Sequence, residues 1–185
     1  DNFCAASADT IYEMRGARWE RVKSNIERLR GLARTRDGVI WVAAADGLHQ
    51  FNNGVWIAHG DDEGLPSLVT HDVIEDRHGR TWAATSRGAV QYFPESDPDE
   101  PRTLPPTIVE TDGDETRGVV IRFQGVDKWN YTPSNRLLYA YRLDEGSWSP
   151  FSNITLATFP KLSAGPHYLQ ARAMDRNGNQ DPSTA

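Results

Sequence analysis

The most metal-like stretch of the sequence holds two histidines and a glutamate, His71, Glu75 and His78, within eight residues. On a helix, spacings of four and seven residues would gather the three side chains on one face, near the spacing of zinc enzymes. On a strand, His71 and Glu75 would face one side of the sheet and His78 the other. Because this stretch lies in register with a repeat of strands, described below, we predict a strand and a turn, and no metal site.

A second stretch, residues 175–181 (Asp-Arg-Asn-Gly-Asn-Gln-Asp), resembles a calcium loop in composition only. In the EF-hand loop the glycine is the sixth residue and a glutamate is the twelfth. Here Gly178 is the fourth residue, and no glutamate follows at the twelfth position. The sequence therefore favours a hairpin turn at Asn177-Gly178, and it predicts neither a metal nor any other cofactor.

No catalytic constellation is evident along the chain. Cys4 is the single cysteine and has no histidine close by in the sequence, and no serine stands in a Gly-x-Ser-x-Gly setting. No glycine-rich phosphate loop opens a helix. A single cysteine also excludes an intramolecular disulfide and a cysteine-based zinc site. We expect no catalytic activity from this chain.

Aromatic side chains in loops are the remaining residues that could bind a ligand, because sugars stack on flat apolar rings. Trp129 and Tyr131 fall in one predicted loop and Trp148 in another. Core packing, or a contact between domains, is the alternative use of such rings. These three residues are the ligand-binding candidates, and the ligand site itself remains unknown.

Charge and length bound the classes of function. The 185-residue chain carries 20 Lys and Arg against 26 Asp and Glu, a formal net charge of −6. This balance disfavours nucleic acid as a partner, because phosphate neutralisation needs an excess of cations. No apolar run approaches the roughly 20 residues of a membrane span, and the first residues lack a signal pattern. We expect any export signal or membrane anchor to lie outside this sequence.

A repeat with an offset of 41 residues dominates the first half of the chain. Residues 37–51 return as residues 78–92, with four matched anchors: Gly38 and Gly79, Trp41 and Trp82, Gly47 and Gly88, Phe51 and Tyr92. A period near 40 with glycine and aromatic anchors is typical of β-propeller blades, each a sheet of four strands. We therefore expect Trp41 and Trp82 to be structural.

A weaker third copy precedes these two. Residues 3–9 resemble residues 41–47, and the spacing of Tyr12, Gly16 and Trp19 resembles that of Phe51, Gly54 and Trp56. An amphipathic helix over residues 18–34 is the alternative, because its apolar residues fall at helical spacing. We favour strands, because the register of the repeat continues through this segment.

The predicted blades are too few to close a propeller. Closed propellers use about four to eight blades, so the smallest needs on the order of 160 residues at this period. The pattern ends near residue 93, so residues 1–93 are predicted to form two to three blades of an incomplete propeller. Open blade edges seek partners, and we expect self-association, as a homodimer, through them.

The second half of the chain has a different all-β pattern. Residues 94–106 hold five of the eleven prolines and are predicted to be a stiff linker. Strands are expected over 107–110, 119–123, 137–143, 155–159 and 167–173, with Tyr168 in a tyrosine corner. This spacing predicts an immunoglobulin-like or fibronectin-III-like β-sandwich over residues 107–185. Few residues remain after Gly178 for a last strand, so the sandwich is expected to lack that strand.

Both halves resemble known modules. The pattern Asp-Gly-x-x-Trp with a later Gly-Leu, over residues 37–48, resembles the two-component regulator propeller repeat. The second copy departs from it, with His78 before the first glycine, and with Ala89 after Gly88 where the first copy has Leu48. The C-terminal half is similar to the three-tyrosine domain, through four segments: Tyr139-Ala140-Tyr141-Arg142-Leu143, Trp148, Leu162-x-x-Gly165-x-x-Tyr168, and Arg172-Ala173 with Asn177-Gly178.

What this resemblance implies is the periplasmic sensor region of a bacterial inner-membrane protein. In that family a membrane helix and then a histidine kinase or a diguanylate cyclase follow the sandwich, and carbohydrate breakdown products are sensed. The parent protein would then be anchored in the membrane, and this chain would relay ligand binding toward it. Two alternatives stay open: a non-catalytic accessory region of a secreted carbohydrate-active enzyme, and a propeller scaffold for protein partners.

Overall fold

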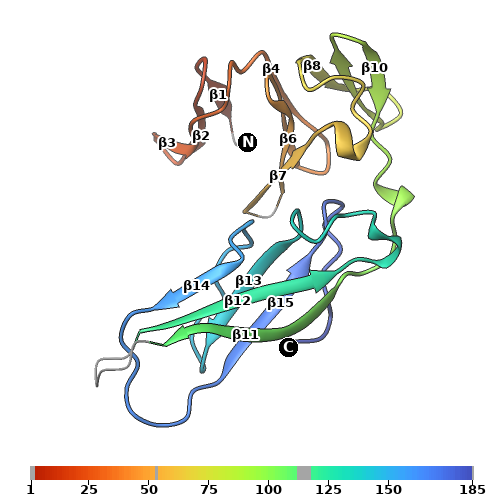
Figure 1. Ribbon diagram of the computed structural model, residues 1–185. Helices are drawn as coiled ribbons and strands as arrows, with labels where there is room; N and C mark the ends of the chain where they lie inside the picture. The colour runs from red at the N-terminus through yellow and green to blue at the C-terminus, as the bar shows by residue number, and fades with distance from the viewer. Residues whose placement is uncertain (1–2, 53, 112–117, 185) are drawn as a thin grey trace. The chain divides into compact units, whose positions relative to one another are not determined.

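The computed structural model describes residues 3–52, 54–111 and 118–184 of the chain. The chain divides into two compact units, Asp1–Phe93 and Pro94–Ala185 (Figure 1). Strands form both units, joined in the described part only by turns, loops and the short 3-10 helices η1 (Asp61–Glu63), η2 (Pro94–Ser96) and η3 (Lys128–Asn130). The predicted all-β fold class, blades followed by a sandwich, is confirmed.

Three antiparallel sheets follow one another along the first unit. The strands of the first sheet are β1 (Cys4–Ala6), β2 (Ile11–Arg15) and β3 (Arg18–Lys23). Those of the second are β4 (Gly31–Arg34), β5 (Ile40–Ala44), β6 (Gly47–Asn52) and β7 (Val55–His59). Those of the third are β8 (Thr70–Glu75), β9 (Thr81–Thr85) and β10 (Gly88–Gln91). The alternative helix over residues 18–34 is wrong, because β3 and β4 occupy that segment.

The 41-residue repeat extends to individual hydrogen bonds. Before β5, the Thr35 N–H donates to the Val39 carbonyl and the Gly38 N–H to the Thr35 carbonyl, both at 2.9 Å. Before β9, the Asp76 N–H donates to the Arg80 carbonyl (2.9 Å) and the Gly79 N–H to the Asp76 carbonyl (3.1 Å). Gly38 and Gly79 have φ values of 91° and 79°, the left-handed region that a glycine adopts without strain. Each copy therefore builds the same turn.

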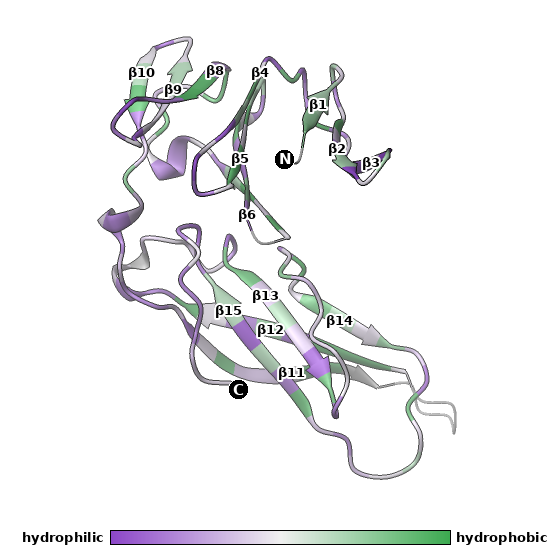
Figure 2. Ribbon diagram, turned by 180° about the vertical axis from the view of Figure 1, so that it is seen from behind, coloured by the Kyte–Doolittle hydropathy of each residue, from purple (hydrophilic) through white to green (hydrophobic). Residues whose placement is uncertain are grey.

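Strand β5 is the centre of the blade unit because both of its faces are buried. Ile40, Val42 and Ala44 pack toward Ile11 and the first sheet. The alternate residues of β5 pack toward β8 and β9 in a second cluster, formed by Val39, Trp41, Ala43, Leu48, Leu65, Val73 and Ala83. A strand buried on both faces has a continuous apolar run in place of an alternating one, as the colouring of β5 in Figure 2 shows.

The second unit is a β-sandwich of two antiparallel sheets. One sheet has the order β11 (Arg102–Thr111), β12 (Val119–Val126) and β14 (Leu156–Phe159). The other pairs β13 (Leu138–Leu143) with β15 (Leu169–Met174). Alternate residues from both sheets meet in one core, which contains Ile121, Phe123, Leu137, Tyr139, Ala157, Ala171 and Ala173. The sheets therefore face each other, as aligned sandwiches do.

The prediction of a linker over residues 94–106 is wrong in its second half. Strand β11 begins at Arg102, which pairs with Val126, and continues past Pro105 and Pro106. The pairing shifts between Leu104 and Thr107. Proline is tolerated there because β11 is an edge strand, and an irregularity in the ladder removes the need for a backbone donor. The unit boundary itself lies between Phe93 and Pro94.

The last described residues bond to β15 but form no strand of their own. Gln180 forms a single bridge with Met174, and the Asp181 N–H donates to the Ala173 carbonyl at 3.0 Å.

The tyrosine-corner prediction is wrong: the Tyr168 ring is 74% exposed, and the loop is held by a bond from the Tyr168 N–H to Asp144 Oδ1 (2.9 Å). An exposed ring does not anchor the core.

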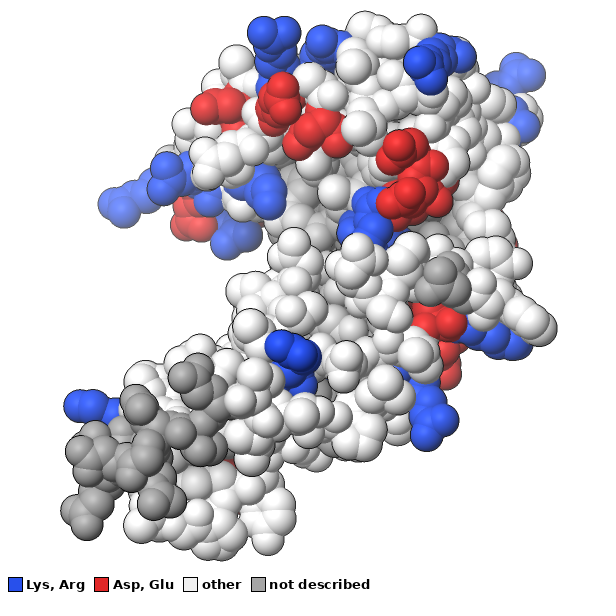
Figure 3. Space-filling view, viewed as in Figure 1, with Lys and Arg blue, Asp and Glu red and all other residues white. Residues whose placement is uncertain are grey.

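The face of the blade unit in Figure 3 carries acidic and basic side chains side by side. No helix among the described residues has the length and apolar character needed to cross a bilayer.

Candidate functional site

Two of the three predicted ligand-binding residues lie in the loop that follows β12. Trp129 belongs to η3, has a φ of 57° and is 79% exposed, and Tyr131 is 58% exposed. A left-handed backbone is uncommon for a bulky residue and marks the turn as an unusual one. The two rings therefore present apolar surface to solvent, as a sugar-stacking site requires.

Trp148 lies in a different setting, against the β13–β15 sheet. The guanidinium carbon of Arg172 lies 4.4 Å from the centroid of the Trp148 ring, and that of Arg142 lies 5.0 Å away. Such cation–π contacts fix the ring against its own sheet. Trp148 thus belongs to a group separate from Trp129 and Tyr131, and its ring is engaged by arginine.

The metal-like stretch adopts the predicted strand and turn. His71 lies on β8, where its ring nitrogens contact Arg30 Nη1 and Ser86 Oγ, each at 3.1 Å. Glu75 Oε2 accepts from the Arg36 N–H at 3.0 Å. His78 follows β8 in the turn, where its Nε2 accepts from Arg77 Nε at 3.1 Å. The three side chains therefore contact different partners.

A row of Ser163, His167 and Asp144 has the order of a hydrolase triad. His167 Nδ1 lies 2.9 Å from Asp144 Oδ2, and His167 Nε2 lies 3.3 Å from Ser163 Oγ. However, Nε2 also lies 3.0 Å from the Ser163 carbonyl oxygen, which can only accept a hydrogen bond. When Nδ1 donates to Asp144, the protonated imidazole donates from Nε2 to this carbonyl, and in that state Nε2 cannot accept the serine proton. The row then closes a loop.

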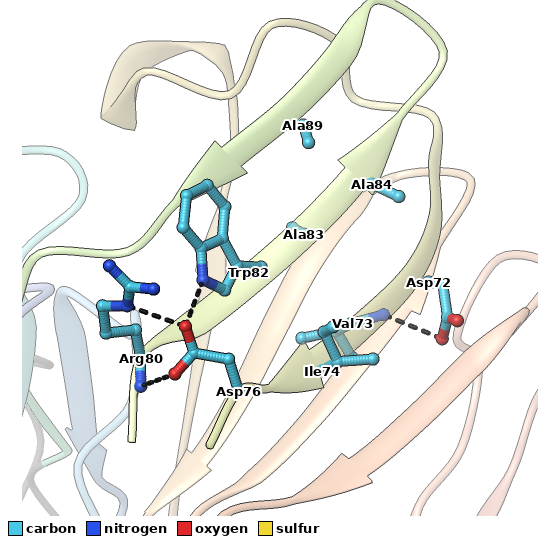
Figure 4. Close-up of a pocket in the computed structure, with 9 residues that line it drawn as sticks. All are labelled: Asp72, Val73, Ile74, Asp76, Arg80, Trp82, Ala83, Ala84 and Ala89. Carbon is cyan, nitrogen blue, oxygen red and sulfur yellow. Dashed lines mark hydrogen bonds and ion pairs between the residues drawn. The ribbon is translucent and has the colours of Figure 1, made fainter. Parts of the chain in front are cut away.

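An open depression of about 470 Å³ lies on the β8–β9–β10 sheet (Figure 4). Asp76 Oδ2 accepts from Arg80 Nε (2.7 Å) and from Trp82 Nε1 (3.1 Å), and Asp76 Oδ1 accepts from the His78 and Arg80 N–H groups. Burial acts to raise the pKa of Asp76, but these four hydrogen bonds together hold it well below its ordinary value. The polar groups of the depression therefore satisfy one another.

The repeat shows what kind of surface this depression is. Trp82 matches Trp41, which is 2% exposed because the third sheet covers it and because it packs on His59 and Tyr92. Trp82 is only half-buried, and Ile74, its partner across the ladder, is 54% exposed. The depression is thus the counterpart of the face that the second sheet presents to the third, left uncovered. Its geometry suits packing against another blade.

Three buried aspartates converge in the sandwich unit. Asp97 follows η2, Asp127 directly follows β12 and Asp175 directly follows β15. They are 3%, 8% and 0% exposed, and one carboxylate oxygen from each lies within 4.8 Å of the others. We call this group the aspartate cluster. Its members come from three segments that are distant in the sequence.

Hydrogen bonds position the cluster but leave part of it without a donor. Asn179 donates to both oxygens of Asp175, from its N–H to Oδ1 (2.8 Å) and from Nδ2 to Oδ2 (2.7 Å). The Thr132 N–H donates to Asp127 Oδ2 at 2.7 Å. Asp97 Oδ1 and Asp127 Oδ1 are buried with no hydrogen-bond partner among the described residues. Buried oxygens of this kind are costly, and a native structure leaves few of them.

The charges of the cluster are also unbalanced. None of the three carboxylates forms an ion pair with a described lysine or arginine, and Lys128, next to Asp127 in the chain, is paired with Asp99 (Nζ–Oδ1 2.8 Å). Burial, reinforced by the charges of Asp97 and Asp127, raises the pKa of Asp175 to about 6 against the opposing bonds from Asn179. Burial and the charge of Asp127 likewise raise the pKa of Asp97.

The sequence could not reveal this cluster through spacing within one loop. Asp175 was weighed as part of a calcium-like loop, whereas its neighbours in space are Asp97 and Asp127 and not the rest of residues 175–181. One signal was available: an aspartate directly follows strands of the sandwich, as at Leu143-Asp144, Val126-Asp127 and Met174-Asp175, and the last two belong to the cluster. The topology of the two sheets brings the ends of β12 and β15 together.

Comparison with known proteins gives a likeness of fold. No protein-family model and no curated protein sequence matches the chain. Among solved structures, 99% of the chain aligns with 30% of the extracellular domain of BT3049 from B. thetaiotaomicron, described as a hybrid two component system, with a TM-score of 0.51 and 16% identity. It also aligns with 28% of the extracellular domain of BT4673 from the same organism, with a TM-score of 0.36 and 14% identity. The chain thus spans less than a third of either structure.

Proposed function

We propose that this chain is part of the extracytoplasmic sensor region of a membrane-bound signalling protein of the two-component type. The blades would take part in ligand sensing, and the sandwich would relay their rearrangement toward a membrane helix and a cytoplasmic output domain. The chain itself supplies no catalysis in this proposal, because the one triad-like row found among the described residues, at His167, has its base nitrogen engaged by a carbonyl oxygen. The likeness in fold to the extracellular domain of BT3049 supports the signalling role.

The observation that carries the proposal is the uncovered face of the third sheet. On this face Trp82 is half-buried, whereas the matching Trp41 is buried in the second sheet, and Ile74 is exposed, whereas the matching Ala33 packs against the core of that sheet. Apolar blade faces are stable when another blade covers them. These blades therefore fit a role as a portion of a larger propeller, in which further blades of the parent protein cover the face. A second copy of this chain is the alternative cover.

A carbohydrate-derived ligand is the expected signal. Trp129 and Tyr131 offer exposed rings in one loop, and stacking on such rings is a common way to bind a sugar. Titration of the chain with oligosaccharides, followed by tryptophan fluorescence, tests this part. The response should disappear in Trp129→Ala and persist in Trp148→Ala, whose ring is engaged by Arg142 and Arg172.

The decisive experiment is to read the open reading frame on both sides of this sequence. The proposal expects further 40-residue blade repeats and an export signal upstream, and a membrane helix followed by a kinase or cyclase domain downstream. A catalytic glycosidase domain, or a stop codon with no membrane helix, would remove the signalling role. The alternative, in which a second copy of the chain covers the exposed face of the third sheet, is tested by analytical sedimentation. A dimer that Ile74→Arg converts to a monomer would indicate that a second copy occupies the face.

A further inference from the structure

We propose that the aspartate cluster of Asp97, Asp127 and Asp175 is a calcium-binding site. The inference is independent of the signalling role, because it depends only on the sandwich unit. Two observations carry it. Three carboxylates, each more than nine-tenths buried, converge within 4.8 Å, and two of their oxygens, Asp97 Oδ1 and Asp127 Oδ1, have no hydrogen-bond partner among the described residues.

A cation resolves both the charge and the hydrogen-bond deficit of the cluster. Three like charges in a region of low dielectric repel one another strongly, and burial removes the water that would otherwise screen them. Hydrogen bonding compensates only Asp175 fully, through the two bonds from Asn179. A divalent ion between the carboxylates supplies opposite charge to all three and ligation to the two oxygens that lack donors. Buried carboxylates of this kind are paired or coordinate metals.

The donor set selects the kind of ion. Carboxylate oxygens without nitrogen or sulfur donors favour hard cations such as Ca²⁺, Mg²⁺ and Mn²⁺. Ca²⁺ binds its oxygen ligands at about 2.3–2.6 Å, so ligands on opposite sides of the ion are about 5 Å apart, whereas across Mg²⁺ they are about 4.2 Å apart. The oxygens of the cluster lie within 4.8 Å of one another, so one ion of either size can contact all three. Ca²⁺ is favoured because it tolerates irregular geometry, whereas Mg²⁺ demands an octahedron.

The positions of the ligands indicate what the ion would do. Asp127 directly follows β12 of one sheet and Asp175 directly follows β15 of the other, so an ion between them would tie the two sheets of the sandwich together. Asp97 adds the segment after η2, which follows the last residue of the blade unit by four positions. Asn179, which donates to Asp175, also donates from Nδ2 to the Asp97 carbonyl at 2.8 Å. Calcium binding would therefore fasten three segments at one end of the sandwich.

The test is calcium titration of the 185-residue chain after treatment with EDTA, followed by calorimetry and by thermal unfolding. We expect one Ca²⁺ per chain, with a Kd between about 10⁻⁵ and 10⁻³ M, the range of weak sensor and extracellular sites. At a Ca²⁺ concentration of about 100 times Kd, the unfolding equilibrium constant of the sandwich should fall about 100-fold. Mg²⁺ at the same concentration should have a smaller effect. Absence of binding up to about 10 mM Ca²⁺, on the order of ten times the weakest expected Kd, would overturn the proposal.

A matched pair of variants locates the ion. In Asp127→Asn, the amide oxygen still accepts from the Thr132 N–H, and the amide nitrogen can donate to the other two carboxylates. We therefore expect Asp127→Asn to be as stable as the native chain in EDTA, or more stable, and to lose the response to Ca²⁺. Glu145→Gln removes the same charge at an exposed turn of the same unit and should keep the full response. An undiminished calcium response in Asp127→Asn would place the ion elsewhere.

Discussion

The two units of this chain use carboxylates in opposite ways. In the blades, Asp76 closes a local turn and accepts four hydrogen bonds, all from residues within six positions in the chain. In the sandwich, Asp97, Asp127 and Asp175 come from distant segments and leave two buried oxygens without a donor among the described residues. A carboxylate that is satisfied locally stabilises a turn, whereas carboxylates that converge from afar without donors indicate a ligand.

The same contrast appears in the apolar residues. The blade unit buries residues that recur with the repeat, so the exposed face at Ile74 and Trp82 can be compared with the matching face of the second sheet, which is covered. The sandwich has one closed core between its two sheets. The blade unit therefore has an exposed apolar face at its surface. The sandwich instead has buried carboxylate oxygens without hydrogen-bond donors in its interior, in the aspartate cluster.

The largest effect should come from a tryptophan that the blades bury. Trp41→Ala should destabilise the blade unit by about 3–5 kcal/mol, because it removes a large ring from a filled core. Trp129→Ala, at an exposed ring, should change stability by no more than about 0.5 kcal/mol. Hydrogen exchange followed by mass spectrometry checks this, with protection lost in β5 and β9 and kept in β12 and β15. Equal loss in both units would show that they unfold as one cooperative unit, which would contradict this prediction.

A smaller effect on stability should distinguish glycine substitutions in the four-stranded second sheet from those in the three-stranded third sheet. Gly47 and Gly88 are matched by the repeat and have φ values of 133° and 127°. A Cβ at Gly47 would lie 2.5 Å from the His59 carbonyl oxygen on β7, whereas a Cβ at Gly88 meets nothing within 4 Å. Gly88→Ala should cost about 1–2 kcal/mol from backbone strain alone, and Gly47→Ala about 3 kcal/mol or more. Urea denaturation of both variants measures the difference.

The reason for this difference is the strand that follows in each sheet. β7 covers the outer edge of β6 in the second sheet, while no described strand pairs with the outer edge of β10. Equal costs for the two substitutions would mean that a strand also covers β10 in solution. That result would point to self-association of the chain through the edge of β10.

The smallest effect is a dependence on pH in the sandwich. The bond to Asp144, and then the Ser163 carbonyl, raise the pKa of His167 above 6.5; the Tyr168 N–H, and then His167, lower the pKa of Asp144 below 3.8. The histidine contribution to stability is present below pH 6.5 and is lost as the pH rises through the raised pKa. The aspartate contribution is present above pH 3.8 and is lost as the pH falls through the lowered pKa.

The pair should therefore stabilise the sandwich most between about pH 4 and pH 6.5. Melting temperatures of the native chain and of Asp144→Asn, measured from about pH 4 to pH 9, should differ most near pH 5.5 and least at pH 9. The amide oxygen that this substitution introduces still accepts from the Tyr168 N–H, so the variant removes the charge and keeps the acceptor. A difference that does not change with pH would show that the loop is held without the charge of His167.

How much of the fold could be predicted depends on the distance over which each feature is encoded. Gly38 and Gly79 mark the same turn because a positive φ and the hydrogen bonds around it involve only a few neighbouring residues. Pro105 and Pro106 misled the prediction of a linker, because whether a strand tolerates proline depends on its place at the edge of a sheet. Tyr168 had the spacing of a core tyrosine and lies at the surface.

The candidate sites divide in the same way. The loop positions of Trp129 and Tyr131 were predicted from the sequence, but the exposure of their rings came only from the structure. The engagement of Trp148 by Arg142 and Arg172 likewise required the pairing of β13 with β15. Asp175 was noticed and set aside, because a test of spacing within one loop cannot see ligands from other loops.

The sequence by itself determined the period of 41 residues, and with it the turns, the strands and the paired faces of the blades, because those interactions are local or recur at a fixed offset. Only the tertiary structure decided that one blade face stays uncovered and that Asp97, Asp127 and Asp175 meet. Both are consequences of how distant strands pack. The residue type sets the charge of a carboxylate, whereas its burial, which makes a compensating cation favourable, is a property of the folded chain.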